Sequence, residues 1–281
     1  MKRLLIIGAG YVGAELVRQA KAQGWKVFAI TKSGEDGTIE ADVSCFKSVE
    51  KLYEAIGLVD VIVHCASSGR GGSRAYQAVF VEGVQNLTQI FKGTPIIFTS
   101  STSVYAQTEG EVVNEQSITK PMRETGRLLL SAEQHVIEQN GVVARLAGIY
   151  GPSRSMVLKK MLNKTAVIEQ DGHKFINQIH RDDAASALLF LAEGCARGLY
   201  AREIFNVSDS HPVLQINLYK GLAQIFAMDL PPTGPKRVNS KRGWSHKAVS
   251  NLKLKQAGWK PEYDDFLNVA AQLKETINLT K

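Results

Sequence analysis

Three glycines near the start of the chain have the spacing that phosphate binding requires. Gly8, Gly10 and Gly13 form a G-x-G-x-x-G motif directly after the apolar residues 4–7. The first glycine permits a tight turn, the second lets a pyrophosphate approach the backbone, and the third lets the next helix pack closely. Free N–H groups and the helix dipole favour negative charge at such a turn. The motif therefore predicts a dinucleotide-binding site.

The residues around the motif supply its β-α-β context. Val12, Leu16 and Ala20 recur four apart, which is typical of one face of a helix, and a glycine follows them. Residues 27–30 then form a second apolar run. A strand, a helix and a second strand within about thirty residues is the context in which this motif binds dinucleotides. We predict that Tyr11 and Val12 contact the cofactor together with the three glycines.

The end of the second predicted strand carries Thr31, Lys32 and Ser33. An NAD-binding fold usually has a carboxylate here for the adenosine ribose. The first acid after this strand is Glu35, and a cation with two hydroxyls could hold a 2′-phosphate instead. The sequence therefore favours NADP over NAD. The alternative is that Lys32 only faces water.

Three further apolar segments, residues 38–43, 59–66 and 95–100, alternate with helical patterns, one of which covers residues 76–91. Continuous apolar runs suit a parallel sheet that is covered on both faces. The alternation predicts an α/β fold with a doubly wound parallel sheet of the Rossmann type. Ligands bind beyond the carboxyl ends of such strands. The cofactor contacts predicted at these ends are Asp42, Val43, Cys65, Ala66, Ser67 and Thr99.

The second half of the chain follows a different pattern. The strict alternation is lost after Pro152, and short strands near residues 175–180 and 204–207 lie among helical segments. We therefore expect an NAD(P)-binding Rossmann domain over residues 1–152. Residues 153–281 are expected to form mainly a smaller α+β subdomain on the substrate side, with segments that return to the Rossmann core.

Composition narrows the class of protein. The 281 residues are 44% hydrophobic and 22% charged, which is ordinary for a globular protein. No apolar run is long enough to span a membrane, and the first residues lack the shape of a signal peptide. Cys45, Cys65 and Cys195 are few and scattered, as is typical of reduced thiols. We expect a cytoplasmic protein.

The net charge of +7 has two interpretations. A basic surface could bind nucleic acid, or it could be a solvated rim or a wall that attracts an anionic substrate. No nucleic-acid-binding module accompanies the charge, so we expect a small-molecule, anionic substrate and a monomer or homodimer. Much of the excess charge lies late in the chain, in Lys236, Arg237, Lys241, Arg242, Lys247, Lys253, Lys255 and Lys260.

Several segments together resemble a known family. Residues 98–105 read FTSSTSVY, residues 145–152 read RLAGIYGP, and residues 179–184 read IHRDDA. With the glycine motif, they resemble the extended short-chain dehydrogenase/reductase family in its NAD-dependent epimerase/dehydratase branch. The resemblance implies NAD(P) binding, with Leu146 and Ile149 flanking the nicotinamide. It also implies a Ser/Thr–Tyr–Lys set in which the lysine lowers the pKa of the tyrosine that transfers a proton.

The chain departs from this pattern at the catalytic positions. Ser101 falls on the serine position, but the tyrosine and lysine positions fall on Thr125 and Leu129. A helical asparagine of the family falls on Phe80. The sequence therefore resembles atypical members that keep the cofactor fold and lack the Tyr-x-x-x-Lys pair.

These departures leave three hypotheses open. In the first, the protein is an NAD(P)-dependent oxidoreductase or epimerase in which Tyr105 is the acid/base, Arg127 supplies the cation and Ser101 contacts the substrate. Glu124 and His180 are alternative acid/base groups, and Tyr105 could equally be a packing residue. In the second, the protein is a catalytically inactive NADP(H)-binding sensor or regulatory module. The third, a nucleic-acid binder, rests on charge alone.

The sequence predicts no metal site. Asp182 and Asp183 are adjacent acids at a predicted helix start, where carboxylates favour the helix N-terminus. Only His180 lies near them at a spacing suited to a metal ligand.

Overall fold

A computed structural model describes residues 1–69, 71–236 and 244–277 of the chain. The predicted basic residues Arg237, Lys241 and Arg242 lie outside these ranges. The chain forms two compact units. The first unit contains Met1–Val104, Arg123–Arg145 and Ala185–Phe205, and the second contains Tyr105–Met122, Leu146–Ala184 and Asn206–Lys281.

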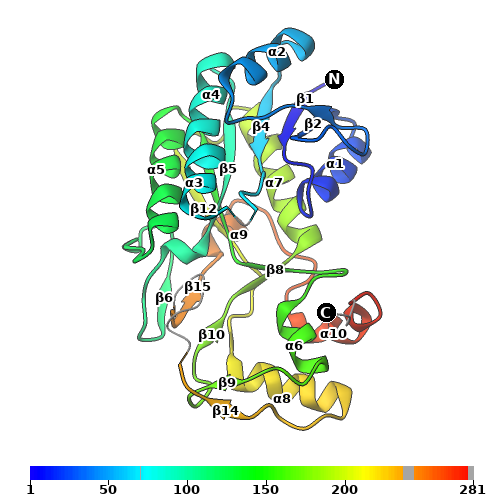
Figure 1. Cartoon of the computed structure of the whole chain (residues 1–281), viewed down its shortest axis with the longest axis vertical. Coiled ribbons are helices and arrows are strands. Elements are labelled where there is room, and N and C mark those ends of the chain that lie inside the picture. Colours follow the sequence, from blue (N-terminus) through cyan, green and yellow to red (C-terminus); the bar gives the residue numbers. More distant parts are fainter. Residues whose placement is uncertain (70, 237–243, 278–281) are drawn as a thin grey trace. The chain divides into compact units, whose positions relative to one another are not determined.

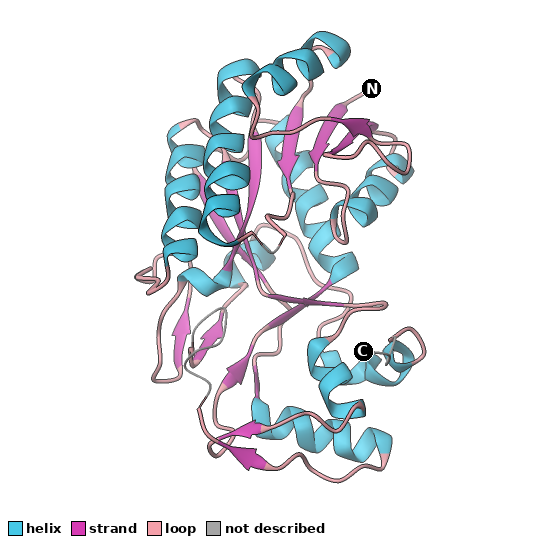
Figure 2. Cartoon of the chain, viewed as in Figure 1, coloured by secondary structure: helices cyan, strands magenta, loops and turns pink. Residues whose placement is uncertain are grey.

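The described part of the first unit contains a seven-stranded sheet (Figure 2). Strand β1 pairs in parallel with β2 and β4, β2 pairs in parallel with β3, and β4 does so with β5. This order places β1, which precedes the glycine motif, near the middle of the sheet. Across the sheet the strands are β3 (Ile39–Glu40), β2 (Lys26–Thr31), β1 (Arg3–Ile7), β4 (Val61–His64), β5 (Ile96–Ser101), β7 (Val142–Leu146) and β12 (Glu203–Val207).

Burial explains why these segments form central strands. Leu4 to Ile7 on β1 and all four residues of β4 are buried, as expected for strands covered on both faces. Figure 1 shows the helices on the two sides of this sheet. On one side are α2 (Phe46–Ile56), α4 (Gly83–Ile90) and α5 (Glu124–Glu138), and on the other α1 (Gly13–Ala22) and the 185–196 part of α7 (Arg181–Ala196). The predicted doubly wound Rossmann sheet is confirmed.

The single regular helix predicted over residues 76–91 is interrupted in the structure by a π-helical turn. The structure has α3 (Gly72–Tyr76), a π-helical turn η1 (Gln77–Glu82) and then α4. The π turn holds Phe80 in an aromatic cluster, with its ring centroid 6.1 Å from that of His64 and 5.9 Å from that of Phe98. A π turn contains an extra residue and shifts the buried face. Periodicity of 3.6 residues could not reveal this shift.

The second unit consists of short elements. Its paired strands are β8 (Gly148–Tyr150) with β11 (Gln178–His180), β6 (Glu111–Val113) with β15 (Lys247–Val249), β10 (Phe175–Ile176) with β13 (Val213–Leu214), and β9 (Ile168–Glu169) with β14 (Thr233–Gly234). Its helices are α6 (Met156–Leu162), α8 (Gln215–Phe226), α9 (Leu252–Gln256) and α10 (Phe266–Lys274). Its apolar core packs around Tyr150, Leu158, Leu218 and Phe266.

A 3-10 turn, η2 (Thr102–Val104), completes the elements of the first unit. Among the described residues, no helix is both long enough and apolar enough to cross a membrane.

Candidate cofactor site

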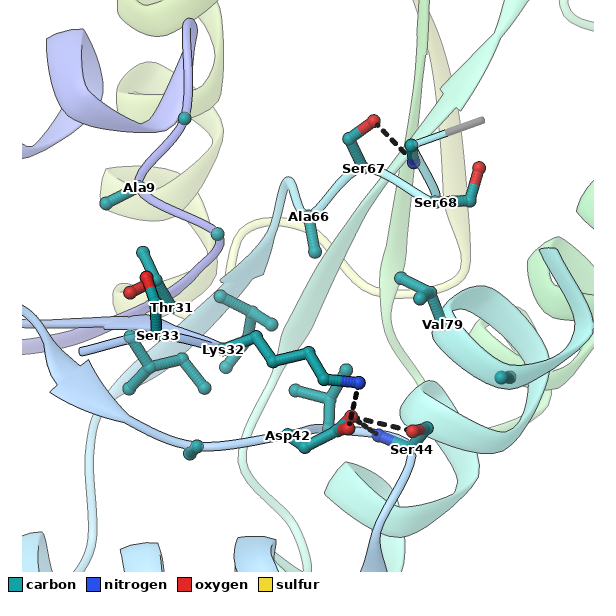
Figure 3. A pocket seen from close by; sticks show the side chains of 18 of the residues that line it. Ala9, Thr31, Lys32, Ser33, Asp42, Ser44, Ala66, Ser67, Ser68 and Val79 are labelled. Atoms are coloured by element: carbon teal, nitrogen blue, oxygen red, sulfur yellow. Dashed lines mark hydrogen bonds and ion pairs between the residues drawn. The ribbon is translucent and has the colours of Figure 1, made fainter. Parts of the chain in front are cut away.

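A cavity of about 750 Å³ opens in the first unit, where β1, β2 and β4 end (Figure 3). The glycine turn, the end of β2 and the residues after β4 form its walls, as expected for a ligand site in a parallel sheet. The predicted cofactor residues that line it are Gly8, Gly10, Thr31, Lys32, Ser33, Asp42, Val43, Ala66 and Ser67.

The glycine turn is fixed by steric limits. Gly8 has φ +89°, and a Cβ there would lie 2.4 Å from the Cα of Ala66. A Cβ on Gly13 would lie 2.0 Å from the Gly8 carbonyl oxygen. At Gly10, by contrast, a Cβ would meet none of the described atoms within 4 Å. Gly8 and Gly13 are therefore required by the fold, whereas Gly10 leaves open space beside its backbone.

Helix α1 follows the glycine turn directly. This ten-residue helix begins at Gly13, and among the described residues no side chain caps its N-terminus. The N–H groups of the first helical turn lack partners within the helix, and the helix dipole adds partial positive charge. An anion can satisfy both.

An ion pair lies in the cavity beyond the end of β2. Lys32 Nζ lies 2.7 Å from Asp42 Oδ2, and Asp42 Oδ1 accepts hydrogen bonds from the N–H and hydroxyl of Ser44 at 3.0 and 2.6 Å (Figure 3). The hydrogen bond with Asp42 and the carboxylate charge raise the pKa of Lys32. Partial burial raises the pKa of Asp42, but the bonds from Lys32 and Ser44 outweigh it and leave the pKa below its usual value. Lys32 thus already has an anionic partner.

The neighbouring wall mixes hydroxyls with charges of both signs. Thr31 Oγ1 lies 2.7 Å from Thr38 Oγ1 and accepts the Gly34 N–H at 3.0 Å. Glu35 and Asp36 line the cavity beside them, and Arg74 lines it from α3. Two acids and one cation therefore join the Lys32–Asp42 pair around the same space.

The end of β4 is held by buried, uncharged groups. His64 Nε2 lies 3.1 Å from the Val79 carbonyl oxygen, and burial lowers the pKa of His64 to about 4. Thr99 Oγ1 donates to the His64 carbonyl oxygen at 2.9 Å. Burial raises the pKa of the Cys65 thiol to about 12, so this thiol is not a nucleophile at neutral pH. Of the residues in this group, Val79 lines the cavity, and the others hold the end of β4 behind it.

Several predicted cofactor residues are not among those that line this cavity. Leu146 and Ile149 belong to the second unit, where Leu146 is buried. The others are Tyr11, Val12, Gly13, Cys65 and Thr99.

Each predicted catalytic residue has a defined place within its own unit. Ser101 ends β5 in the first unit, where its Oγ accepts the Ser103 N–H at 3.2 Å, and Arg127 is exposed on α5. Tyr105 belongs to the second unit, is 1% exposed and donates its hydroxyl hydrogen bond to Asn206 Oδ1 at 2.9 Å. Leu129, at the expected lysine position, is buried.

Asp183 contacts the backbone of a distant segment. Its carboxylate accepts the N–H groups of Glu262 and Tyr263 at 2.8 and 2.9 Å. Burial raises its pKa to about 6. Within the described ranges, no three His, Cys, Asp or Glu side chains gather closely enough to hold a metal ion.

Six polar residues that line the cavity were not among the predicted cofactor contacts: Glu35, Asp36, Thr38, Ser44, Ser68 and Arg74. The Asp42-x-Ser44 spacing after a strand was a usable signal, because a carboxylate commonly accepts the N–H two residues on. Arg74 had no comparable signal, because its position depends on where α3 lies.

Comparisons with known proteins agree with this geometry. Residues 1–172 match the model of the RmlD substrate binding domain family. Protein YeeZ of Escherichia coli K12 is 27% identical over 285 residues, covering 94% of this chain and 97% of YeeZ. A Methylobacillus flagellatus protein assigned to the NAD-dependent epimerases/dehydratases has a structure with TM-score 0.79 and 25% identity, covering 98% of both chains.

A more distant structure shares the fold alone. The UDP-glucose 4-epimerase of Thermus thermophilus, solved with NAD, has a TM-score of 0.76 and 18% identity, covering 97% of this chain and 99% of the epimerase. The family model spans more than half of the chain, and the sheet order, glycine turn and cavity fit it. The chain belongs to the RmlD substrate binding domain family, among the NAD(P)-binding, epimerase/dehydratase-like Rossmann proteins of the extended short-chain dehydrogenase/reductase type.

Proposed function

We propose that the first-unit cavity holds NAD(P), with the pyrophosphate beside Gly10 and the first turn of α1. The observation that carries this proposal is the open space at Gly10, between two glycines that steric limits fix. A pyrophosphate needs such a close approach to backbone N–H groups. Arg74 lines the same cavity and supplies a cation for the phosphates.

We favour NADP over NAD because Lys32 lies at the end of β2. The 2′-phosphate would take the place of the Asp42 carboxylate, so Lys32 would exchange one anion for another. NAD is the second candidate. Glu35 and Asp36 line the same cavity, where carboxylates would bind ribose hydroxyls and repel a 2′-phosphate.

The proposed activity is oxidoreductase or epimerase/dehydratase-type chemistry on a small anionic substrate. A bound nicotinamide supplies hydride transfer. The Ser101 hydroxyl would hold a substrate oxygen. Tyr105 would transfer the proton, and Arg127 would supply the cation beside it. Support for a sugar nucleotide as substrate comes from structural neighbours such as the Thermotoga maritima UDP-glucose 4-epimerase, solved with UDP-glucose.

The alternative is a catalytically inactive NADP(H)-binding sensor. No tyrosine in the sequence is followed four residues later by a lysine. Tyr105 also has its hydroxyl hydrogen-bonded to the fully buried Asn206. A proton donor held in this way must leave Asn206 before it can serve a substrate.

Cofactor titration followed by thermal unfolding tests the binding proposal. A dinucleotide at about 100 times its dissociation constant should stabilise the fold by about 2.7 kcal/mol. Gly10→Ala should leave the melting temperature unchanged and remove this stabilisation, because the new methyl enters open space. Gly8→Ala should unfold the turn itself. Stabilisation that survives Gly10→Ala, or is absent in the wild type with all four dinucleotides, contradicts the proposal.

Turnover separates an enzyme from a sensor. With simple carbonyl compounds, reduced-cofactor absorbance should fall if the wild type is a reductase. With UDP-glucose, chromatography should detect a new product, because an epimerase or dehydratase returns the hydride to its product and leaves cofactor absorbance unchanged. Ser101→Ala should lower the rate about 10²-fold, and Tyr105→Phe should do the same if the tyrosine transfers the proton. Cofactor binding without turnover of any substrate favours the sensor.

A further inference from the structure

Lys247 is a lysine buried in the second unit, on strand β15, with 5% of its surface exposed. Its backbone is fixed on both sides by one side chain. Asn177 Nδ2 donates to the Lys247 carbonyl oxygen at 2.9 Å, and Asn177 Oδ1 accepts the Val249 N–H at 2.7 Å. The lysine therefore occupies a defined position and is not a loose surface side chain.

The charge of Lys247 lacks a carboxylate partner within the described part of the chain. Its Nζ donates to Ser245 Oγ at 2.9 Å, which uses one of its three N–H bonds. Its register partner on β6, Glu111, is exposed, and the Glu111 carboxylate accepts the Glu109 N–H at 2.9 Å.

The sequence shows that no acid nearby along the chain could neutralise it. Between Asp229 and Glu262 there are eight lysines and arginines and no aspartate or glutamate. Residues 70, 237–243 and 278–281 contain no acidic side chain either. Burial lowers the pKa of Lys247 to about 8, and burial is the whole cause of that shift. At neutral pH the side chain is still mostly charged.

A buried ammonium without a counter-charge is costly, and lysine is rarely buried unless paired. An apolar residue would fill this position at lower cost. The Ser245 hydroxyl accepts from Lys247 and keeps its own O–H to donate. Within the described ranges, two N–H bonds of the ammonium and the O–H bond of Ser245 have no acceptor, so that donors surround one positive charge, which is the complement of an oxyanion.

We propose that Lys247, with Ser245, binds the oxyanion of a small ligand, a phosphate or carboxylate group, in the second unit. The proposal deepens the proposed function by locating the anionic group of the substrate, and it rests on that part of the proposal. It is separate from the cofactor proposal, because Lys247 and the cofactor cavity belong to different units.

The test measures anion binding without dinucleotide. Wild-type protein is titrated with inorganic pyrophosphate, UDP and citrate, at constant ionic strength, and followed by thermal shift and calorimetry. At least one probe should stabilise the wild type, and Lys247→Met should lower the affinity for that probe at least tenfold. Lys260→Met removes the same charge from an exposed position and should bind as the wild type does. Pyrophosphate and UDP report a phosphate site, and citrate reports a carboxylate site.

Three outcomes would overturn the proposal: no probe binds, Lys247→Met binds as tightly as the wild type, or Lys260→Met loses as much affinity. If Lys247→Met does not fold, Ser245→Ala takes its place. This variant keeps the lysine and should lower the affinity for the same probe severalfold. Unchanged affinity would again overturn the proposal. NADPH titration of each folded variant should be unchanged, so failure here is distinguishable from failure of the cofactor proposal.

Discussion

The two units treat buried charge in opposite ways. In the first, Glu133 on α5 and Arg145 on β7 form an ion pair of 2.6 Å, and each side chain is only 4% exposed. Ser100 donates a further hydrogen bond to Glu133. In the second unit, the buried Lys247 is held by a hydroxyl, and the buried Asp209 accepts a backbone N–H from His211 at 3.2 Å.

This difference changes protonation. Burial raises the pKa of Asp209 to about 8, helped by the neighbouring carboxylates of Asp265 and Asp183, and burial lowers that of Lys247 to about 8. A neutralised buried pair serves as scaffold, because breaking it leaves an uncompensated charge. Buried groups that titrate near neutral pH are instead candidates for binding or chemistry. The neutralised pair thus lies in the first unit, and the two groups whose pKa burial moves toward neutral pH lie in the second.

The largest effect is expected from Glu133→Gln. It leaves Arg145 buried without a counter-charge and should lower the free energy of unfolding by about 3–5 kcal/mol in urea titrations. Glu138→Gln on the exposed part of the same helix is the control and should stay within about 0.5 kcal/mol. A loss below about 1 kcal/mol for Glu133→Gln would show that the first unit does not depend on this neutralised pair.

Asp209→Asn should raise the free energy of unfolding, by an amount that depends on pH. The pKa of Asp209 is about 8 in the folded protein and near 3.8 when unfolded, so the folded state binds more protons between these values. Its contribution therefore makes stability fall as pH rises from about 4 to 8. Asp209→Asn should be on the order of 3 kcal/mol more stable than the wild type at pH 8 and equal to it at pH 4.

Urea titrations at the two pH values check this prediction. Asp229→Asn, at an exposed position, is the control and should show no such pH dependence. Equal stability of Asp209→Asn and wild type at both pH values would show that Asp209 ionises as freely as an exposed aspartate.

Lys247→Met should raise the free energy of unfolding by a smaller amount, about 1–3 kcal/mol at pH 7 without added anion. The pKa of Lys247 is about 8 when folded and 10.5 when unfolded, so the unfolded state binds more protons between these values. Burying the Lys247 charge therefore destabilises the fold fully below pH 8, and this destabilisation falls as the pH rises toward 10.5. Guanidinium titrations at pH 7 and 10 measure it. A variant less stable than wild type at pH 7 would make Lys247 a structural residue.

The smallest effect on the fold is expected at the exposed ion pair. Lys32 is 82% exposed on its side chain, so Lys32→Ala should leave the melting temperature unchanged. Its affinity for NADPH relative to NADH should fall about tenfold. Lys21→Ala, an exposed lysine on α1, is the control for charge. An unchanged NADPH preference in Lys32→Ala would leave NAD as the favoured cofactor.

Much of the fold could be predicted from sequence because its signals are local. Apolar runs such as residues 4–7, which Gly8 follows, and residues 27–30, which Thr31 follows, showed where the central strands end. The cavity is lined at three of these ends, near Gly8, Thr31 and Ala66. The π turn at Phe80 could not be predicted, because it depends on the His64 and Phe98 rings packed against it.

The sequence by itself determined where the backbone must bend and which segments lie inside, because glycine conformation and apolar periodicity are properties of neighbouring residues. Only the tertiary structure decided which charges meet. Lys32 reaches Asp42, Tyr105 reaches Asn206, and Lys247 is buried away from every described carboxylate. Those outcomes depend on how separate segments pack, and the energy of a charge depends on what packing places beside it.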